Sequence, residues 1–276
     1  MTGATYTRNY VYAALRGAGY SHKVMVRAAA QRDQEQRAQY WEDINKYIPH
    51  PSCLVFGDET ALDGRTARRK RGWGAIGSPV CISEILFRGS HVSVLALYSR
   101  SDGFTAWAHC LGGYDTATFL EHIAVLIKAV MKPYPGADSV LCLDNCRIHH
   151  AEELKLRRMC AKEGAHLIFL APYCPIDNPI EPGFSVFKSC WRRNSEMLNK
   201  DKNQFPTLDS AISWCMANCY TDITDAGNSA PDGPEHTYNK FGYAVPDAVH
   251  AQSIIDEWNA GRGLVLPSLS DDQDSE

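Results

Sequence analysis

The sequence has 276 residues, of which 45% are hydrophobic and 22% are charged, a balance typical of globular proteins and not of disordered ones. Four acidic residues among the last six account for the formal net charge of −4, so the rest of the chain is neutral. This excludes a generally basic protein that coats nucleic acid, but it allows a local basic surface.

The N-terminal fifty residues are predicted to be helical. A first helix spans about Thr7 to Arg16 and ends where glycines follow. A second, polar helix runs from near Ser21 toward Tyr47 and is ended by the prolines at 49 and 51. Its apolar positions are sparse, which predicts a surface or connecting helix.

Residues 51–200 change to short β-rich runs with helical patterns between the later ones. Ser101-Asp-Gly103 separates the second run from the third and predicts a hairpin. Helical spacing is found over about 116–131, 151–163 and 179–193. These features predict a mixed sheet with helices on its faces. The runs are Cys53–Gly57, Val92–Tyr98, Phe104–Leu111, Val140–Leu143 and Leu167–Leu170.

Residues 201–276 are predicted to form a helix over Leu208–Tyr220, a turn-rich linker, a short helix over Ser253–Trp258 and an acidic tail. No apolar leader follows Met1, and no apolar run reaches the ~18 residues that a membrane span needs, so neither secretion nor a membrane partner is expected.

Ten cysteines occur, and two pairs have the spacing C-x3-C, Cys142/Cys146 and Cys215/Cys219. Reduced, mostly buried thiols of an intracellular protein are the expected state. A zinc site built from these pairs and from His149 and His150 is the alternative, although zinc-binding pairs normally have tighter spacing.

Acidic residues interrupt the apolar runs at two points, Asp58 after LVFG and Asp144 after VLCL. A carboxylate at the end of a buried strand is costly unless a cation compensates it, and ligand sites gather beyond strand ends. Two such carboxylates on neighbouring strands suit Mg²⁺ or Mn²⁺, which prefer oxygen ligands. Successive strand residues face opposite ways, so Glu59 cannot join Asp58, and we assign Asp58 to the site.

A third acid, Glu181, follows a proline-stiffened connection at the start of a helix. Asn178-Pro-Ile-Glu181 also reads as a capping box with proline at the first helical position. Pro182 argues against that register, and a helix that starts at Pro182 would leave Glu181 to bind a metal.

Three blocks of this sequence resemble the Asp-Asp-Glu (DDE) catalytic domain of the mariner-like superfamily of transposases. They are GDET at Asp58, LDNCRIH at Asp144, and APYCPIDNPIEPGFSVFK around Glu181, with 36 residues between the last two acids. The resemblance covers roughly residues 50–193 and, more weakly, 5–50.

The resemblance implies an α/β, ribonuclease H-like mixed sheet flanked by helices, with an N-terminal helical segment. It also implies a site in which two Mg²⁺ or Mn²⁺ ions promote phosphoryl transfer and are held by Asp58, Asp144 and Glu181. Asn145 and His149 match the family's D-N-x-x-x-H and are expected to support the metal site. The implied domains are a partial helix-turn-helix remnant with a connector helix (1–50), the catalytic domain (51–200), and a C-terminal helix, linker and acidic tail (201–276).

Two groups of cations are predicted to contact DNA backbone, which makes binding salt-dependent and not sequence-specific. Lys188 lies seven residues after Glu181, two helical turns along one face. The run at 65–71 could alternatively be a nuclear-import signal. The predicted contacts are Arg65, Arg68, Arg69, Lys70, Arg71, Lys188, Arg192 and Arg193.

We therefore expect a transposase-derived, metal-dependent DNA endonuclease and strand transferase that binds double-stranded DNA, with a homodimer left open and a nuclear location. Fifty residues cannot hold the two helix-turn-helix units of full-length relatives, so the chain is expected to be N-terminally incomplete. The alternatives are a ribonuclease H-type nuclease and a catalytically silent or domesticated DNA-binding protein.

Overall fold

The computed structural model describes residues 7–21, 33–63, 66, 91–200, 203–220 and 233–261. The chain divides into two units, Met1–Arg32 and Asp33–Glu276. The first contains helix α1 (Arg8–Gly17), whose N-cap Thr7 accepts a hydrogen bond from the N–H of Tyr10 at 3.3 Å. Every described side chain of this unit is exposed.

The second unit contains one five-stranded sheet with the order β3-β2-β1-β4-β5. β1 pairs antiparallel with β2, and β2 with β3 across the predicted hairpin, whereas β4 runs parallel to both β1 and β5. This confirms the mixed sheet. The strands are β1 (Leu54–Leu62), β2 (Val92–Ser99), β3 (Gly103–Leu111), β4 (Val140–Leu143) and β5 (His166–Phe169).

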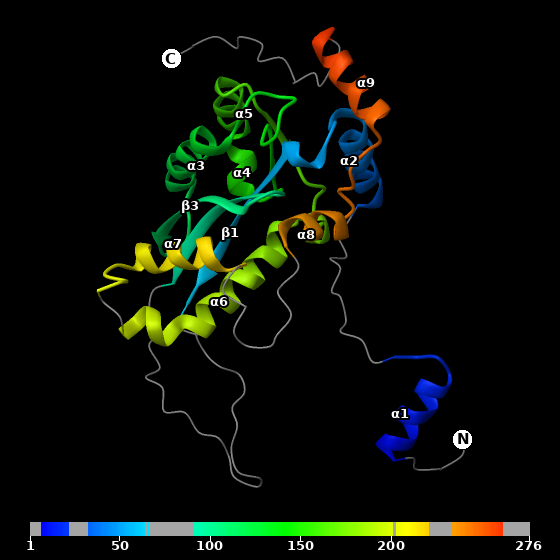
Figure 1. Cartoon of the computed structure of the whole chain (residues 1–276), viewed down its shortest axis with the longest axis vertical. Coiled ribbons are helices and arrows are strands. Elements are labelled where there is room, and N and C mark those ends of the chain that lie inside the picture. Colours follow the sequence, from blue (N-terminus) through cyan, green and yellow to red (C-terminus); the bar gives the residue numbers. More distant parts are fainter. Residues whose placement is uncertain are drawn as a thin grey trace. The chain divides into compact units, whose positions relative to one another are not determined.

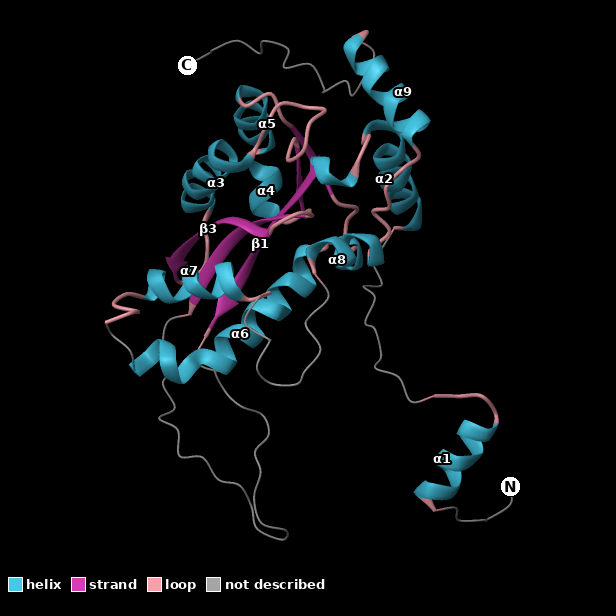
Figure 2. Cartoon of the chain, viewed as in Figure 1, coloured by secondary structure: helices cyan, strands magenta, loops and turns pink. Residues whose placement is uncertain are grey.

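Helices lie on both faces of this sheet, as Figures 1 and 2 show for α3, α4 and α5 on one side and α6 and α7 on the other. Short 3₁₀ turns precede β1 (η1, Pro51–Cys53) and α6 (η2, Pro175–Asp177). The helices are α2 (Gln34–Tyr47), α3 (Thr116–Val130), α4 (Arg147–Ala151), α5 (Glu153–Lys162), α6 (Ile180–Lys200), α7 (Leu208–Asn218), α8 (Pro234–Lys240) and α9 (Ala248–Asn259).

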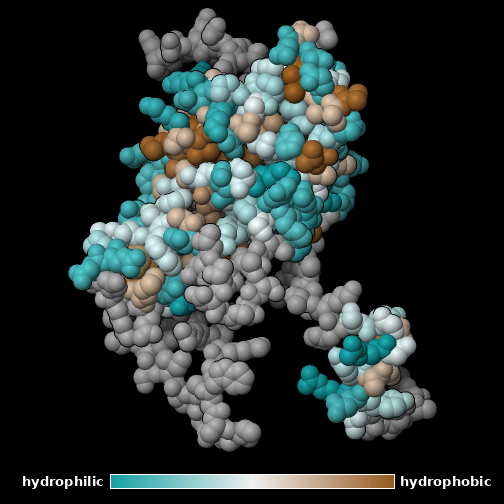
Figure 3. Space-filling view, in the orientation of Figure 1, coloured by the Kyte–Doolittle hydropathy of each residue, from teal (hydrophilic) through white to brown (hydrophobic). Residues whose placement is uncertain are grey.

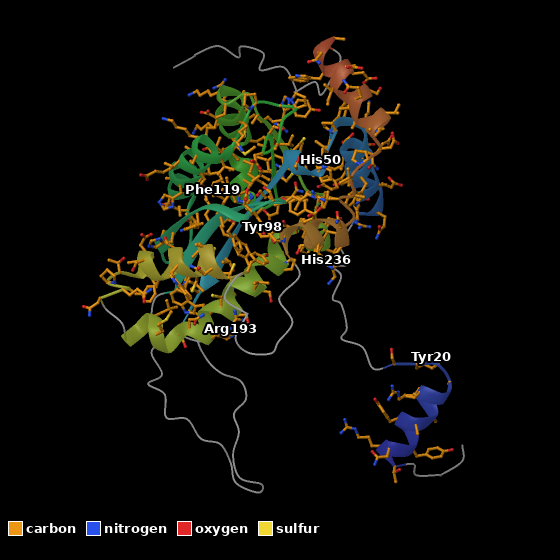
Figure 4. All side chains as sticks on the ribbon, viewed as in Figure 1. Tyr20, His50, Tyr98, Phe119, Arg193 and His236 are labelled. Carbon is orange, nitrogen blue, oxygen red and sulfur yellow. The ribbon has the colours of Figure 1, made fainter. Side chains whose placement is uncertain are left out.

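Alternating strand residues supply two separate hydrophobic clusters, one on each face. Leu54 and Phe56 of β1 pack with residues of α6, α7 and α8, whereas Val55 packs with α3 and α5. Tyr98 and Phe119, labelled in Figure 4, belong to the first and second cluster respectively. The parity of each strand residue therefore decides which layer its side chain enters, and this applies to the acids as well.

Two elements differ from the predictions. β1 continues to Leu62, so Asp58 lies within the strand and not at its end, because β2 pairs with β1 up to Leu62. Helix α2 was predicted as a surface or connecting helix, yet Tyr40 and Ile44 are buried in the main cluster. These two buried residues, with the partly buried Trp41 packed against the same cluster, hold the helix against the sheet domain.

Helix α6 begins at Ile180, one residue after the start predicted near residue 179, and the alternative start at Pro182 is wrong. Pro182 is the third helical residue, where the N–H has no intrahelical acceptor and proline is tolerated. Gly183 allows close approach to β2, since a Cβ at this position would lie 2.8 Å from the Tyr98 ring. The first turn of α6, which carries Glu181, is thereby held tightly against the sheet.

Within the described ranges, no helix combines the length and apolar character needed to cross a membrane. The face shown in Figure 3 is largely hydrophilic, with hydrophobic residues in small separate patches.

Candidate active site

Asp58 and Asp144 lie side by side on neighbouring strands. Gly57 of β1 pairs with Leu143, the last residue of β4. Because the two strands are parallel, Asp58 and Asp144, which follow these two residues, lie next to each other. Asp58 shares the parity of Phe56, which places it on the face of the sheet that α6 covers. Only 9% of Asp58 is exposed, whereas the Asp144 side chain is 42% exposed.

Glu181 joins the two aspartates from the first turn of α6. All three acids line one cavity of about 300 Å³ beside the sheet. The structure therefore brings together the three acids proposed from the sequence, which lie far apart in the chain. The other lining residues are Asn145, Cys146, Leu170, Ala171, Pro172, Tyr173, Cys174, Pro175 and Asn178.

The cavity strongly disfavours negative charge on its innermost acid. Burial, followed by repulsion from Asp144, Glu59 and Glu181, raises the pKa of Asp58 to about 8. Burial also raises the pKa of Glu181, against the opposing effect of the Lys188 charge. Three carboxyl groups that repel one another in one cavity form a site that a cation would stabilise.

His149 is fully buried and links Asp144 to Glu59. Its Nδ1 lies 2.8 Å from Asp144 Oδ1, and its Nε2 lies 3.0 Å from Glu59 Oε1. Burial acts to lower the pKa of His149, but its bonds to Asp144, Cys146 and Glu59 outweigh burial and raise it to about 12. The raised pKa favours the protonated imidazole, which would donate to both carboxylates.

The same contacts orient Asp144. Burial opposes its ionisation, but the hydrogen bond and charge of His149, together with the Cys146 N–H at 3.0 Å, lower the pKa of Asp144. Both donors act on Oδ1, which leaves Oδ2 for a cation. Glu59 has the opposite parity to Asp58, as the alternation of strand residues predicted, and the structure shows that its carboxylate contacts His149.

Asn145 supports the loop after β4. Its amide donates to the carbonyl of Leu170 and its Oδ1 contacts His150 Nε2. The side chain thereby ties the end of β4 to the end of β5.

The paired-cysteine zinc site does not assemble in the described part of the chain. Cys142, Cys215 and Cys219 are fully buried within the main hydrophobic cluster. Among described residues, the one group of three with ligand atoms close enough for a metal ion is Asp144, Cys146 and His149, within 4.8 Å of one another. This group contains a single cysteine, and its histidine is already bonded to two carboxylates.

The comparisons with known proteins assign the chain to a family. Residues 53–203 match the family model described as DDE superfamily endonuclease, which is more than half of the chain. The chain belongs to this family. A search of the curated proteins found no match.

The DDE-family chain also shares its fold with solved transposase structures, which confirms the ribonuclease H-like mixed sheet. The Mos1 transposase paired-end complex with left transposon end is 15% identical, with a TM-score of 0.53 over 92% of this chain and 70% of that chain. A pre-cleavage Mos1 transpososome is 15% identical, with a TM-score of 0.52 over 94% of this chain and 71% of that chain. The Mos1 mariner paired end complex with Mn is 14% identical, with a TM-score of 0.52 over 94% of this chain and 72% of that chain.

Sequence reasoning missed three residues that hold the acids of this DDE domain in place. The Asn178 amide donates to Asp58 Oδ2 at 2.9 Å. The buried Asp177 carboxylate forms a two-pronged ion pair with Arg37 of α2, with Nε–Oδ2 at 2.6 Å and Nη2–Oδ1 at 2.7 Å. The order Asp-Asn just before Glu181 was visible, but nothing in the sequence pointed to Arg37.

The predicted DNA contacts are placed only in part. The basic run at 65–71 lies outside the described residues apart from Thr66. Lys188 is half-buried on α6, and its charge acts on Glu181. Arg192 is half-buried farther along α6, where the exposed Arg193, labelled in Figure 4, donates to Ser189 Oγ at 3.3 Å.

Proposed function

We propose that this chain is a metal-dependent DNA endonuclease and strand transferase whose site holds two Mg²⁺ or Mn²⁺ ions. The observation that carries the proposal is the convergence of Asp58, Asp144 and Glu181 on one cavity. The family match supports the endonuclease class. Structures that share the fold hold transposon DNA or Mn, which supports DNA and a divalent cation as partners of this chain.

The donor set fits hard divalent cations. Carboxylate oxygens are the ligands that Mg²⁺ and Mn²⁺ prefer. Burial and the repulsion of neighbouring carboxylates raise the pKa of Asp58, and a bound cation would offset both effects. Asp58, Asp144 and Glu181 would hold the ions, because their carboxyl groups line one cavity. When bound, such ions activate the attacking water or 3′-hydroxyl and stabilise the leaving oxygen of the scissile phosphodiester.

The chain's own residues position and charge the site, and none of them forms a covalent intermediate. His149 and the Cys146 N–H fix the orientation of Asp144, and the Asn178 amide holds Asp58. Lys188 adds a positive charge on the α6 side, where it would attract the phosphate backbone. The basic run at 65–71 is proposed to grip the backbone as well.

Nicking of supercoiled plasmid tests this function. We expect the wild type to convert supercoiled plasmid to open circles with Mg²⁺ or Mn²⁺ and to leave it intact in EDTA. Glu121→Gln, which removes an exposed carboxylate of α3, is the matched control and should nick at the wild-type rate.

Two outcomes would contradict the proposal in different ways. Cleavage of an RNA–DNA hybrid without cleavage of duplex DNA would indicate a ribonuclease H-type nuclease. Retention of duplex DNA by filter binding, with no cleavage under any cation, would indicate a silent DNA-binding protein.

The raised pKa of Asp58 makes cation binding dependent on pH. Below about pH 8 Asp58 carries a proton that a cation must displace, so affinity for Mg²⁺ should rise with pH up to about 8. We expect the increase in Tm on adding Mg²⁺ to be larger at pH 9 than at pH 6.5. The Asp58→Asn variant has no proton to release at residue 58. Its increase in Tm on adding Mg²⁺ should therefore be smaller and should be the same at pH 6.5 and pH 9. A wild-type increase that is equal at both pH values would refute the link.

A further inference from the structure

One residue at the cavity has a backbone conformation that its side chain disfavours. The N–H of Cys174 donates to the carbonyl of Ala171 at 3.3 Å and closes a four-residue turn with Pro172 in second place. Tyr173, in third place, has a φ of +56°. A positive φ at this place is typical of a type II turn, which favours glycine or asparagine because a Cβ crowds the backbone.

Tyr173 gains little from packing against the residues that the structure describes. Tyr173 is 59% exposed, whereas its turn partners Ala171 and Cys174 are buried. Within the described ranges, the hydroxyl of Tyr173 has no hydrogen-bond partner. Strained residues that the protein's own contacts do not explain are concentrated at functional sites.

The turn belongs to the rim of the carboxylate cavity, and Tyr173 lines that cavity together with Asp58, Asp144 and Glu181. The segment that follows is firmly anchored, because Asp177 pairs with Arg37 and Asn178 donates to Asp58. Ile176, three residues after Tyr173 in the same connection, is 49% exposed. A rigid rim therefore presents an aromatic side chain beside the three acids, and an exposed aliphatic side chain lies in the same connection.

A nucleobase fits this rim better than a phosphate does, because neither side chain carries charge. Aromatic side chains stack on unpaired bases, and aliphatic side chains are inserted as wedges between base steps. Any phosphodiester that enters the cavity brings a base on each side of it. The following inference rests on the proposed function and concerns the state of the DNA at that point.

We propose that Tyr173 stacks on an unpaired nucleobase next to the scissile phosphodiester, so that the strand to be cut is unpaired where it enters the cavity. Asparagine at this position should relieve the backbone strain and lose the stacking. Phenylalanine should keep both the strain and the stacking. The two variants therefore separate a binding role from a structural one.

The test uses a DNA duplex with a short central unpaired stretch containing 2-aminopurine, with Ca²⁺ as the divalent cation and the full chain. We expect wild type and Tyr173→Phe to quench 2-aminopurine fluorescence, and Tyr173→Asn to lose the quenching and about tenfold in affinity for this DNA. Affinity for the fully paired duplex should change little. The Tm of Tyr173→Asn without DNA should equal or exceed that of wild type.

Equal quenching and affinity in wild type and Tyr173→Asn would overturn the stacking role while leaving the proposed function intact. A fall in the Tm of Tyr173→Asn would overturn the strain argument, because it would show that the tyrosine stabilises the fold. If the wild-type protein binds neither the duplex with the unpaired stretch nor the fully paired duplex, the proposed function itself fails.

Discussion

Asp144→Asn, Asp58→Asn and Glu181→Gln are each expected to slow plasmid nicking by at least about a thousandfold. Removing one ionised ligand weakens the hold on a cation that supplies several kcal/mol of transition-state stabilisation, and about 4 kcal/mol corresponds to a thousandfold in rate. Duplex DNA affinity, measured by filter binding, should change less than about threefold, because these acids make no contact with the phosphate backbone unless a cation is bound.

The same substitutions should differ in their effect on the stability of the metal-free protein. The stability that protonated Asp58 contributes is present below its ordinary pKa of 3.8 and is lost as the pH rises to about 8. Asp58→Asn should therefore gain stability relative to wild type over this range. Asp144→Asn should instead lose stability, because His149 would then lack one of its two carboxylate partners.

Urea unfolding in EDTA at pH 5 and pH 8 measures this difference. Glu121→Gln again serves as the control, since its carboxylate is exposed on α3. If Asp58→Asn and Asp144→Asn shift the unfolding midpoint in the same direction at pH 8, the assigned electrostatic roles are wrong. Full nicking activity in any of the three variants would remove that acid from the proposed site.

Arg37→Ala is expected to destabilise the protein by about 3 kcal/mol or more. Asp177 is 1% exposed, and removing its partner leaves a buried carboxylate without compensation. Asp177→Ala should be milder, because the Arg37 side chain is 29% exposed and can be hydrated. The double variant should be more stable than Arg37→Ala alone, since it contains no unpaired buried charge.

Urea unfolding of the three variants, with the exposed Arg158→Ala as a matched control on α5, tests this order. Additive losses in the double variant would show that the two side chains do not depend on each other. Because Asn178 follows Asp177 and holds Asp58, we also expect Arg37→Ala to slow nicking in conditions where it remains folded.

Hydrophobic periodicity predicted most of the elements that build the sheet. The five apolar runs became the five strands, and the hairpin at Ser101-Asp-Gly103 formed as expected. The alternation of side chains on β1 correctly separated Asp58 from Glu59. These features depend on neighbours in the sequence, which is why local reasoning reached them.

Helix α2 and the start of α6 illustrate where local reasoning failed. The polar sequence of α2 did not indicate that Tyr40 would be buried, because its partners lie far along the chain; its hydroxyl is 2.7 Å from that of Tyr243. The start of α6 at Ile180 depends on where the connection from β5 ends, and not on proline chemistry alone.

The sequence by itself determined where the strands lie along the chain, which three acids were candidates and which family pattern they match. Side-chain type and spacing are local properties, which is why the sequence was sufficient for these features. Only the tertiary structure decided that Arg37 neutralises Asp177, that His149 joins Glu59 to Asp144, and that Tyr173 stands strained at the rim of the cavity. Those features arise from contacts between distant segments, and their free energies depend on burial that no stretch of sequence specifies alone.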